Sequence, residues 1–292
     1  MKKVFLTLAL SAAAFLGANA EEKTKVYDFS DIRSINAGHT YEIYVTEGNS
    51  DKVKVVYDDR LEKYMEIRHS GAKGTLYLEM DELPLKLRTG KVPGIKVYIE
   101  MDKISNIDLS GAASVRFEGR FKADDLEIDL SGASKMKELQ INGTSLDIVC
   151  SGATSAMVTG NFDEEIDIDL SGASKAVLNG CAPSLECDLS GACNFRGAGE
   201  YDTCSVACSG ASEASMEGAA DVFDAECSGA SKIEARDLIT RKASVSLSGS
   251  SKAVVNASKT LTYDVSRASK LVYYGDAELN DISQDSNVER GR

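Results

Sequence analysis

Serine is the residue type whose spacing in this sequence most resembles a row of reactive groups. A serine that opens a short turn recurs every 18 to 21 residues, at Ser110, Ser131, Ser151, Ser171, Ser190, Ser209, Ser228, Ser248 and Ser266. A nucleophilic serine needs a base and an orienting acid beside it. The two histidines, His39 and His69, lie outside these repeats, and nothing distinguishes one serine from its copies. We therefore interpret the serines as structural residues that bend the chain and bond to neighbouring repeats.

Carboxylates form a second series, two and four positions before the serine, which is counted as position zero. They are Glu127, Asp129, Asp147, Asp167, Asp169, Glu186, Asp188, Asp224 and Glu226. Stacked like charges repel, and a cation such as Ca²⁺ could stabilise them. However, the series is interrupted at Val149, Ala207 and Ser246, and the calcium-binding nonapeptide is missing. Lysines at position +4 could offset part of the repulsion. We favour a solvated acidic face over a weak Ca²⁺ site, and we predict no catalytic, cofactor-binding or metal-ligating residues.

All seven cysteines lie between Cys150 and Cys227. Five occupy positions where other repeats have Leu, Ile or Val, and they are predicted to be buried thiols: Cys150, Cys187, Cys204, Cys208 and Cys227. Cys193 replaces a small residue at position +3, and Cys181 is expected in a loop. Cys208 and Cys227 fall on neighbouring repeats at a spacing compatible with a disulfide, although parallel register disfavours one. A zinc site is not expected because there is no Cys-x-x-Cys and no nearby histidine.

The period of about 20 residues predicts the elements that carry these side chains. Positions −5, −3 and −1 are mostly apolar while −4 and −2 are polar, which indicates a strand with one buried face. Positions +5 and +7 predict a second strand, and the frequent glycine at +9 predicts another corner. Two or three short strands per repeat are typical of a parallel β-helix. The alternation excludes helical repeats, and a propeller blade needs about twice this length.

Three regions are expected along the chain. Residues 1–20 read as a cleaved signal peptide, with Lys2 and Lys3, an apolar core and the cleavage site Ala18-Asn19-Ala20. Residues 21–102 contain short alternating runs without the 20-residue period, and they are predicted to form an N-terminal β region that caps or starts the solenoid. Residues 103–292 are predicted to form the β-helix repeats, continuous with the preceding region as one elongated domain, with a degenerate last coil after Ser283.

The net charge limits the classes of partner. It is −13 for the whole sequence, and loss of the two signal-peptide lysines makes it −15. Nucleic acids and anionic lipids both favour basic surfaces, so neither is expected as a partner. The composition fits neither a disordered chain nor a membrane protein, and no membrane span is predicted.

Three stretches carry a resemblance to a known family. They are the opening "DFSDIRSINAGHTYEIYVTEGNSDKVKVVYDD", the segment "KVYIEMDKISNIDLSGAASV" with the serial "LSGAS" repeats after it, and the ending "SRASKLVYYGDAELNDISQDSNV". In this order they resemble the head GIN domain family, described as putative auto-transporter adhesins of Bacteroidetes-like bacteria. The resemblance implies a right-handed, single-stranded parallel β-helix with no catalytic residues to carry over. The chain departs from the family at His39 and Thr40, where a Gly-Gly pair is usual.

These patterns predict a non-enzymatic, exported, all-β protein of the periplasm, outer-membrane surface or extracellular space. The first hypothesis is an adhesin or envelope binding module whose unknown ligand is extracellular or part of the envelope, such as a glycan or a host surface. The second is a purely structural envelope protein. The third, a polysaccharide-active β-helix enzyme, is disfavoured because the coils are short and Trp is absent. A site is expected where the period fails, around His39 to Tyr44 and at the last coils.

Overall fold

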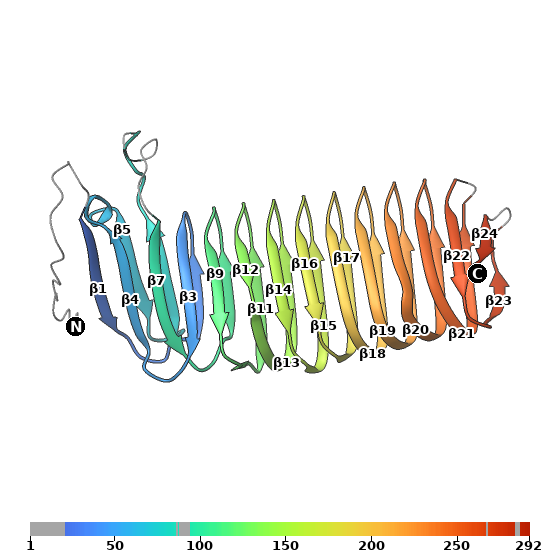
Figure 1. The fold of residues 1–292 in the computed structure, drawn as a ribbon, viewed down its shortest axis with the longest axis horizontal. Helices are drawn as coiled ribbons and strands as arrows, with labels where there is room; N and C mark the ends of the chain where they lie inside the picture. Colours follow the sequence, from blue (N-terminus) through green and yellow to red (C-terminus); the bar gives the residue numbers. More distant parts are fainter. Residues whose placement is uncertain (1–20, 86, 88–93, 267, 284–286) are drawn as a thin grey trace.

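The computed structural model describes residues 21–85, 87, 94–266, 268–283 and 287–292. The predicted signal peptide, residues 1–20, lies outside the described residues. The chain forms an elongated all-β solenoid of about nine turns with about 20 residues per turn, which confirms the predicted fold class (Figure 1). Its strands form one continuous hydrogen-bonded sheet that is wound into two opposed faces.

Face 1 is made of the strands that follow the serine turns, together with the N-terminal strands that pair with them. In spatial order these are β1 (Glu22–Asp28), β4 (Lys52–Asp58), β7 (Ile95–Met101), β3 (Tyr41–Glu47), β9 (Ser114–Glu118), β12 (Lys135–Lys137), β14 (Ser155–Thr159), β16 (Lys175–Asn179), the first parts of β18 (Asn194–Cys208), β19 (Glu213–Cys227), β20 (Lys232–Leu247) and β21 (Lys252–Val265), then β22 (Lys270–Tyr274) and β24 (Val288–Arg290).

Face 2 is made of the strands that precede the turn. In spatial order these are β5 (Met65–Ser70), β6 (Thr75–Met80), β2 (Ser34–Ala37), β8 (Asn106–Leu109), β11 (Asp125–Leu130), β13 (Leu139–Cys150), β15 (Phe162–Leu170), β17 (Ala182–Leu189), the last parts of β18 to β21, and β23 (Glu278–Asp281). The short β10 (Phe121–Lys122) pairs with β13 near the lower edge, and a 3-10 turn, η1, spans Asp59–Leu61.

The core consists of ladders of equivalent residues, as the period predicts. Ile148, Ile168 and Cys187 are paired in register on successive coils and are all buried. All residues at position −1 from Leu109 to Val265, and all at +5 from Val115 to Leu271, are buried as well. Because one coil cannot hide its own apolar face, each coil is stabilised mainly by its two neighbours.

The Ser-Gly-Ala-Ser turns stack along the upper edge. Eight of their glycines have φ between 67° and 90°, a left-handed conformation that favours glycine: Gly111, Gly132, Gly152, Gly172, Gly191, Gly210, Gly229 and Gly249. The residue at +3 is buried from Ala113 to Ser269. The hydroxyls of Ser174, Ser212 and Ser231 close their turns, as where Ser174 Oγ donates to the Ser171 carbonyl at 2.7 Å. Two of the serines at position zero bond along the stack, Ser171 to the Cys150 carbonyl at 3.3 Å and Ser209 to the Leu189 carbonyl at 3.2 Å.

The N-terminal region both starts the solenoid and caps it. Strands β2 and β3 form a coil that is wedged between the coil of β6 and β7 and the coil of β8 and β9 (Figure 1). The order of coils in space therefore differs from their order in sequence. Beyond this point β1, β4 and β5 add antiparallel strands that cover the end of the rod. Covering protects the stacked sheet from further edge pairing.

The segment from His39 to Tyr44 is an ordinary turn of the inserted coil rather than a break in the fold. His39 takes the place that glycine holds in the other turns and has a φ of 58°. Tyr41 is buried, and its hydroxyl donates to the Glu79 carbonyl at 2.7 Å. At the other end β24 pairs with β22 through Val288 and Leu271, as predicted for the degenerate last coil. The apolar side chains of Leu279 and Ile282 stay exposed there.

Candidate functional site: a groove beside the turn serines

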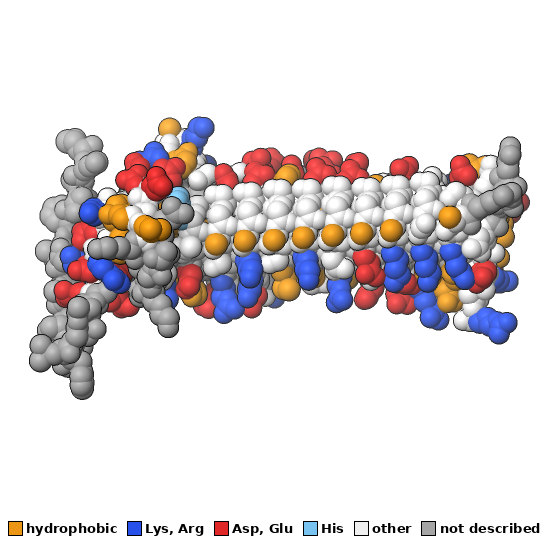
Figure 2. All heavy atoms as spheres, turned by 90° about the horizontal axis from the view of Figure 1, so that it is seen from above, with side chains coloured by type: hydrophobic (Ala, Val, Ile, Leu, Met, Phe, Trp, Pro, Cys, Tyr) orange, Lys and Arg blue, Asp and Glu red, His pale blue; other side chains and the backbone are white. Residues whose placement is uncertain are grey.

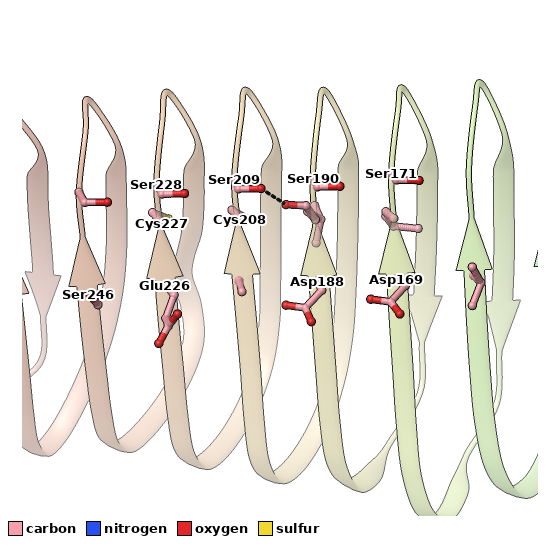
Figure 3. A pocket seen from close by; sticks show the side chains of 15 residues that line it. Asp169, Ser171, Asp188, Ser190, Cys208, Ser209, Glu226, Cys227, Ser228 and Ser246 are labelled. Carbon is pink, nitrogen blue, oxygen red and sulfur yellow. Dashed lines mark hydrogen bonds between the residues drawn. The ribbon is translucent and has the colours of Figure 1, made fainter.

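A straight groove of about 560 Å³ runs along face 2, beside the turns of successive coils (Figure 3). One wall carries the outward carboxylates Asp169, Asp188 and Glu226 at position −2. The other wall carries the turn serines, Ser171, Ser190, Ser209, Ser228 and Ser248. The groove spans about five strand spacings, or ~24 Å at ~4.8 Å per strand. The turn serines recur along the groove, whereas carboxylates occupy three of its six coils.

The interruptions of the acidic series lie in this groove. Val149, Ala207 and Ser246 replace a carboxylate at position −2, and all three line it. Ala207 is paired in register with Asp188 on one side and Glu226 on the other, so a small side chain lies between two acids. The signal for this site in the sequence is therefore the absence of a carboxylate at these three positions. From the sequence alone, that absence was interpreted only as evidence against a cation site.

Two of the five serine hydroxyls of the groove make bonds along the stack. Ser209 Oγ donates to the Leu189 carbonyl of the preceding coil at 3.2 Å, and Ser171 Oγ makes the equivalent bond. Their protons point along the stack, so their lone pairs are left to accept hydrogen bonds from a ligand. Both histidines lie elsewhere: His39 is exposed on the inserted coil, and the ring of His69 packs against Phe29 at 5.1 Å. The described groove thus presents hydrogen-bond acceptors without an imidazole base.

Carboxylates on face 2 repel one another. Partial burial raises the pKa of Asp188, and the negative charges of Asp169 and Glu226 raise it further. Burial and neighbouring acids likewise raise the pKa of Asp108, Asp129 and Asp147. Within the described ranges, no three metal-ligating side chains converge to hold an ion.

The lysines at position +4 do not offset this repulsion by contact, which corrects the expectation from sequence. The turn separates them from the acidic series, so they lie on face 1 while the acids lie on face 2. Figure 2 shows carboxylates along one long side of the rod and most of the lysines along the other. The ion pairs of these lysines are made within face 1, as between Lys232 and Glu213 at 3.1 Å.

An uncharged replacement on the acidic face is expected to stabilise the protein. The raised pKa of Asp129 means that the folded state binds its proton more tightly than the unfolded state. Stability therefore falls as pH rises through the folded pKa. Asp129→Asn should raise the midpoint of thermal unfolding at pH 7, and the gain should shrink near pH 4. Asp58, whose pKa is lowered by the hydrogen bonds from Arg60, is the opposite-sign control, and Asp58→Asn should lower the midpoint at pH 7. A decrease for Asp129→Asn at pH 7 contradicts this account.

The cysteines are buried core residues with one exception. Cys150, Cys187, Cys193, Cys204, Cys208 and Cys227 are buried free thiols, whereas Cys181 is partly exposed. Burial raises the pKa of Cys150 to about 11 and that of Cys204 to about 12. The sulfur of Cys181 accepts the backbone N–H of Glu200 at 3.4 Å. These positions confirm the inward placement that was predicted from the repeat.

Thiol chemistry should report this burial directly, because only an accessible thiolate reacts quickly. Under native conditions an alkylating reagent is expected to modify Cys181 and to leave the six buried thiols unmodified, whereas all seven react in denaturant. Peptide mass spectrometry identifies the labelled positions, and Cys181→Ser is the control that should abolish native labelling. Rapid labelling of Cys208 or Cys227 in the native protein would contradict the buried ladder.

Comparison with known proteins identifies the family. The model of the family described as "Putative auto-transporter adhesin, head GIN domain" matches residues 31–181 and 166–277. The chain belongs to the head GIN domain family. This membership indicates an exported or surface protein of adhesin-like character. No curated protein matches the chain.

The chain is similar to solved structures of proteins from two Parabacteroides species. The protein from Parabacteroides distasonis described as a putative adhesin is 14% identical, with a TM-score of 0.50 over 94% of this chain and 98% of its own. A second putative adhesin, from Parabacteroides merdae, is 13% identical, with a TM-score of 0.49 and the same coverage. A Parabacteroides distasonis protein described as a putative lipid binding protein is 16% identical, with a TM-score of 0.47 over 94% and 98%. At these identities the likeness concerns the fold alone. Over the described part of the head GIN chain, no helix has the length and hydropathy of a membrane span.

Proposed function

We propose that this protein is a non-catalytic, exported binding module of adhesin type, and that its groove binds a neutral, hydroxyl-rich chain such as a glycan. One observation carries the proposal: a turn serine recurs at the same place on five successive coils of the groove, and a carboxylate lies opposite it on three of these coils. A polymer presents the same groups again at each unit, so a repeating groove suits a repeating ligand. A single catalytic centre would instead need one coil to differ from the others.

The chemistry of the walls favours hydroxyl groups as the ligand's contacts. Asp169, Asp188 and Glu226 accept hydrogen bonds, and a hydroxyl bound to an ionised carboxylate makes the stronger, charge-assisted kind. The serine oxygens on the opposite wall add further acceptors. A ligand with negative charges is disfavoured in this groove because it would meet the carboxylate wall directly.

A glycan array with the mature protein tests this proposal. The wild type is expected to bind at least one neutral oligosaccharide, and Ala207→Trp should abolish binding because the indole fills the groove between Asp188 and Glu226. Ser244→Trp is the matched control, since Ser244 is exposed on the same face but does not line the groove. Absence of binding to any glycan or matrix protein rejects the adhesin function and leaves a purely structural role. If both variants lose glycan binding equally, the groove is not the binding site.

A further inference from the structure

Face 1, on the opposite side of the rod from the groove, carries two adjacent rows of cations in a protein whose net charge is −13. Five exposed basic side chains, which we call the basic row, project from strands β9 to β18: Arg116, Lys135, Lys137, Lys175 and Arg196. Strand pairing places them in two adjacent rows along the rod. Lys135 and Lys175 are both in register with Ser155. Arg116 is in register with Lys137, and Arg196 lies further along that second row, in register with Val177. Figure 2 shows positive side chains along this side, with carboxylates interspersed toward both ends.

The cations of the basic row are left largely without partners inside the protein. Over the residues that the structure describes, no carboxylate lies within 4.0 Å of Lys135, Lys137, Lys175 or Arg196, and Arg116 only reaches Glu138 at 3.8 Å. Two lysines on later coils of the same face are paired with carboxylates instead. Lys232 pairs with Glu213 and with Glu234 at 3.1 and 3.3 Å, and Lys270 pairs with Glu289 at 2.8 Å. Lys252 on β21 is also exposed and has no described carboxylate within 4.0 Å, so unpaired cations are concentrated in the coils of β9 to β18 without being confined to them.

Aromatic side chains extend the basic row toward the N-terminal end. Tyr44 is in register with Arg116 and with Tyr98, and the two tyrosine rings stack with centroids 5.1 Å apart. Lys54 Nζ lies 5.6 Å from the centre of the Tyr98 ring, which is 39% exposed. Tyrosine offers an apolar ring and a polar hydroxyl, so it suits a sugar ring that carries its own charge nearby.

We propose that the basic row is the docking surface for a linear anionic polysaccharide of the polyuronate class, laid along the solenoid axis. The cations form two adjacent rows along the axis rather than a compact cluster, which matches a linear polymer with a carboxylate on each unit. The net negative charge does not prevent this, because packed sheets lie ~10 Å apart and the Debye length is ~8 Å at physiological ionic strength. The acids of face 2 are thus screened from a polymer on face 1. An anionic membrane fits less well, since Met157 and Tyr98 are the only large hydrophobic side chains exposed in this described area.

Binding of polygalacturonate, with neutral dextran as the control polymer, tests the basic row by biolayer interferometry. The wild type should bind polygalacturonate more tightly at 50 mM than at 500 mM NaCl, whereas any binding of neutral dextran by the groove should not depend on salt. The double variant Lys137→Glu, Arg196→Glu should weaken binding about tenfold or more, because two attractions become repulsions. The double variant Lys242→Glu, Lys259→Glu changes the net charge equally at exposed sites outside the row, and should bind like the wild type.

Other outcomes overturn this surface. Equal loss in the two double variants would mean that net charge alone controls binding. Binding to phosphatidylglycerol vesicles but not to polygalacturonate would assign the row to a membrane. Salt-sensitive self-association without polymer binding, seen by light scattering, would assign it to a second copy of the chain. Ala207→Trp should leave polygalacturonate binding unchanged, so failure of the groove and failure of the basic row are separable.

Discussion

Replacing Gly191 with alanine is expected to lower the free energy of unfolding by about 3 kcal/mol, from about 1–2 kcal/mol for the left-handed backbone and about 1–3 kcal/mol for steric overlap. Gly191 has a φ of 90°, and a Cβ atom there would lie 2.6 Å from the carbonyl oxygen of Gly172 on the preceding coil. That oxygen is backbone and belongs to the turn stack, so it cannot move aside without disturbing the neighbouring coils.

Equilibrium unfolding in urea measures this effect, and Ala192→Ser is the matched control. Ala192 is exposed at position +2, where the chain itself has Ser250 in a later coil, so this change should alter stability by less than about 0.5 kcal/mol. If Gly191→Ala unfolds at the same urea concentration as the control, the claim that stacked turns require glycine at this position is wrong.

Deletion of one whole coil is expected to leave a folded, shorter rod, whereas deletion of half a coil should abolish the fold of the following coils. Removing residues 151–170 joins Cys150 to Ser171, so every later residue keeps the position in the repeat that it has in the wild type. The new neighbours are compatible, because Met136 would stack on Ala176 and Ile148 on Cys187, all of them core residues. A repeat protein loses only one set of neighbour contacts in such a change.

Removing residues 151–160 instead deletes a serine turn and strand β14 while keeping strand β15. The chain would then enter β15 without the reversal that separates face 1 from face 2, so the apolar side chains could no longer meet the core. Far-ultraviolet circular dichroism and cooperative unfolding distinguish the two deletions. A whole-coil deletion that fails to fold would contradict a solenoid stabilised coil by coil.

The sequence predicted the repeating part of this fold closely because each position of the repeat obeys one physical constraint. Inward positions such as Ile148 and Ile168 must be apolar, and turn positions such as Gly172 must tolerate a positive φ. The coil of β2 and β3 was not predictable in its place, because strand pairing inserts it between two coils that come later in the chain. This coil was also hard to recognise as a repeat because His39 occupies the turn position that glycine holds elsewhere.

The surface sites were harder to predict than the core. The groove arises where Ala207 and Ser246 interrupt a row of acids, and an absence of charge is a weak signal in a single sequence. The basic row could not be predicted from the sequence, because lysines and acids alternate along the chain yet lie on opposite faces of the rod. Only the winding of the coil separates Lys175 on β16 from Asp169 on β15, six positions apart in the sequence.

The affinity of the groove for oligosaccharides of increasing length tests the proposed function most directly. For a neutral glycan that binds on the array, calorimetry should show affinity rising with each added sugar until the chain fills the ~24 Å groove. In Ala207→Trp this gain should disappear, while Ser244→Trp should retain it. A monosaccharide that binds as tightly as the oligomer, or a length dependence that Ala207→Trp leaves intact, would contradict a repeating site on a repeating fold.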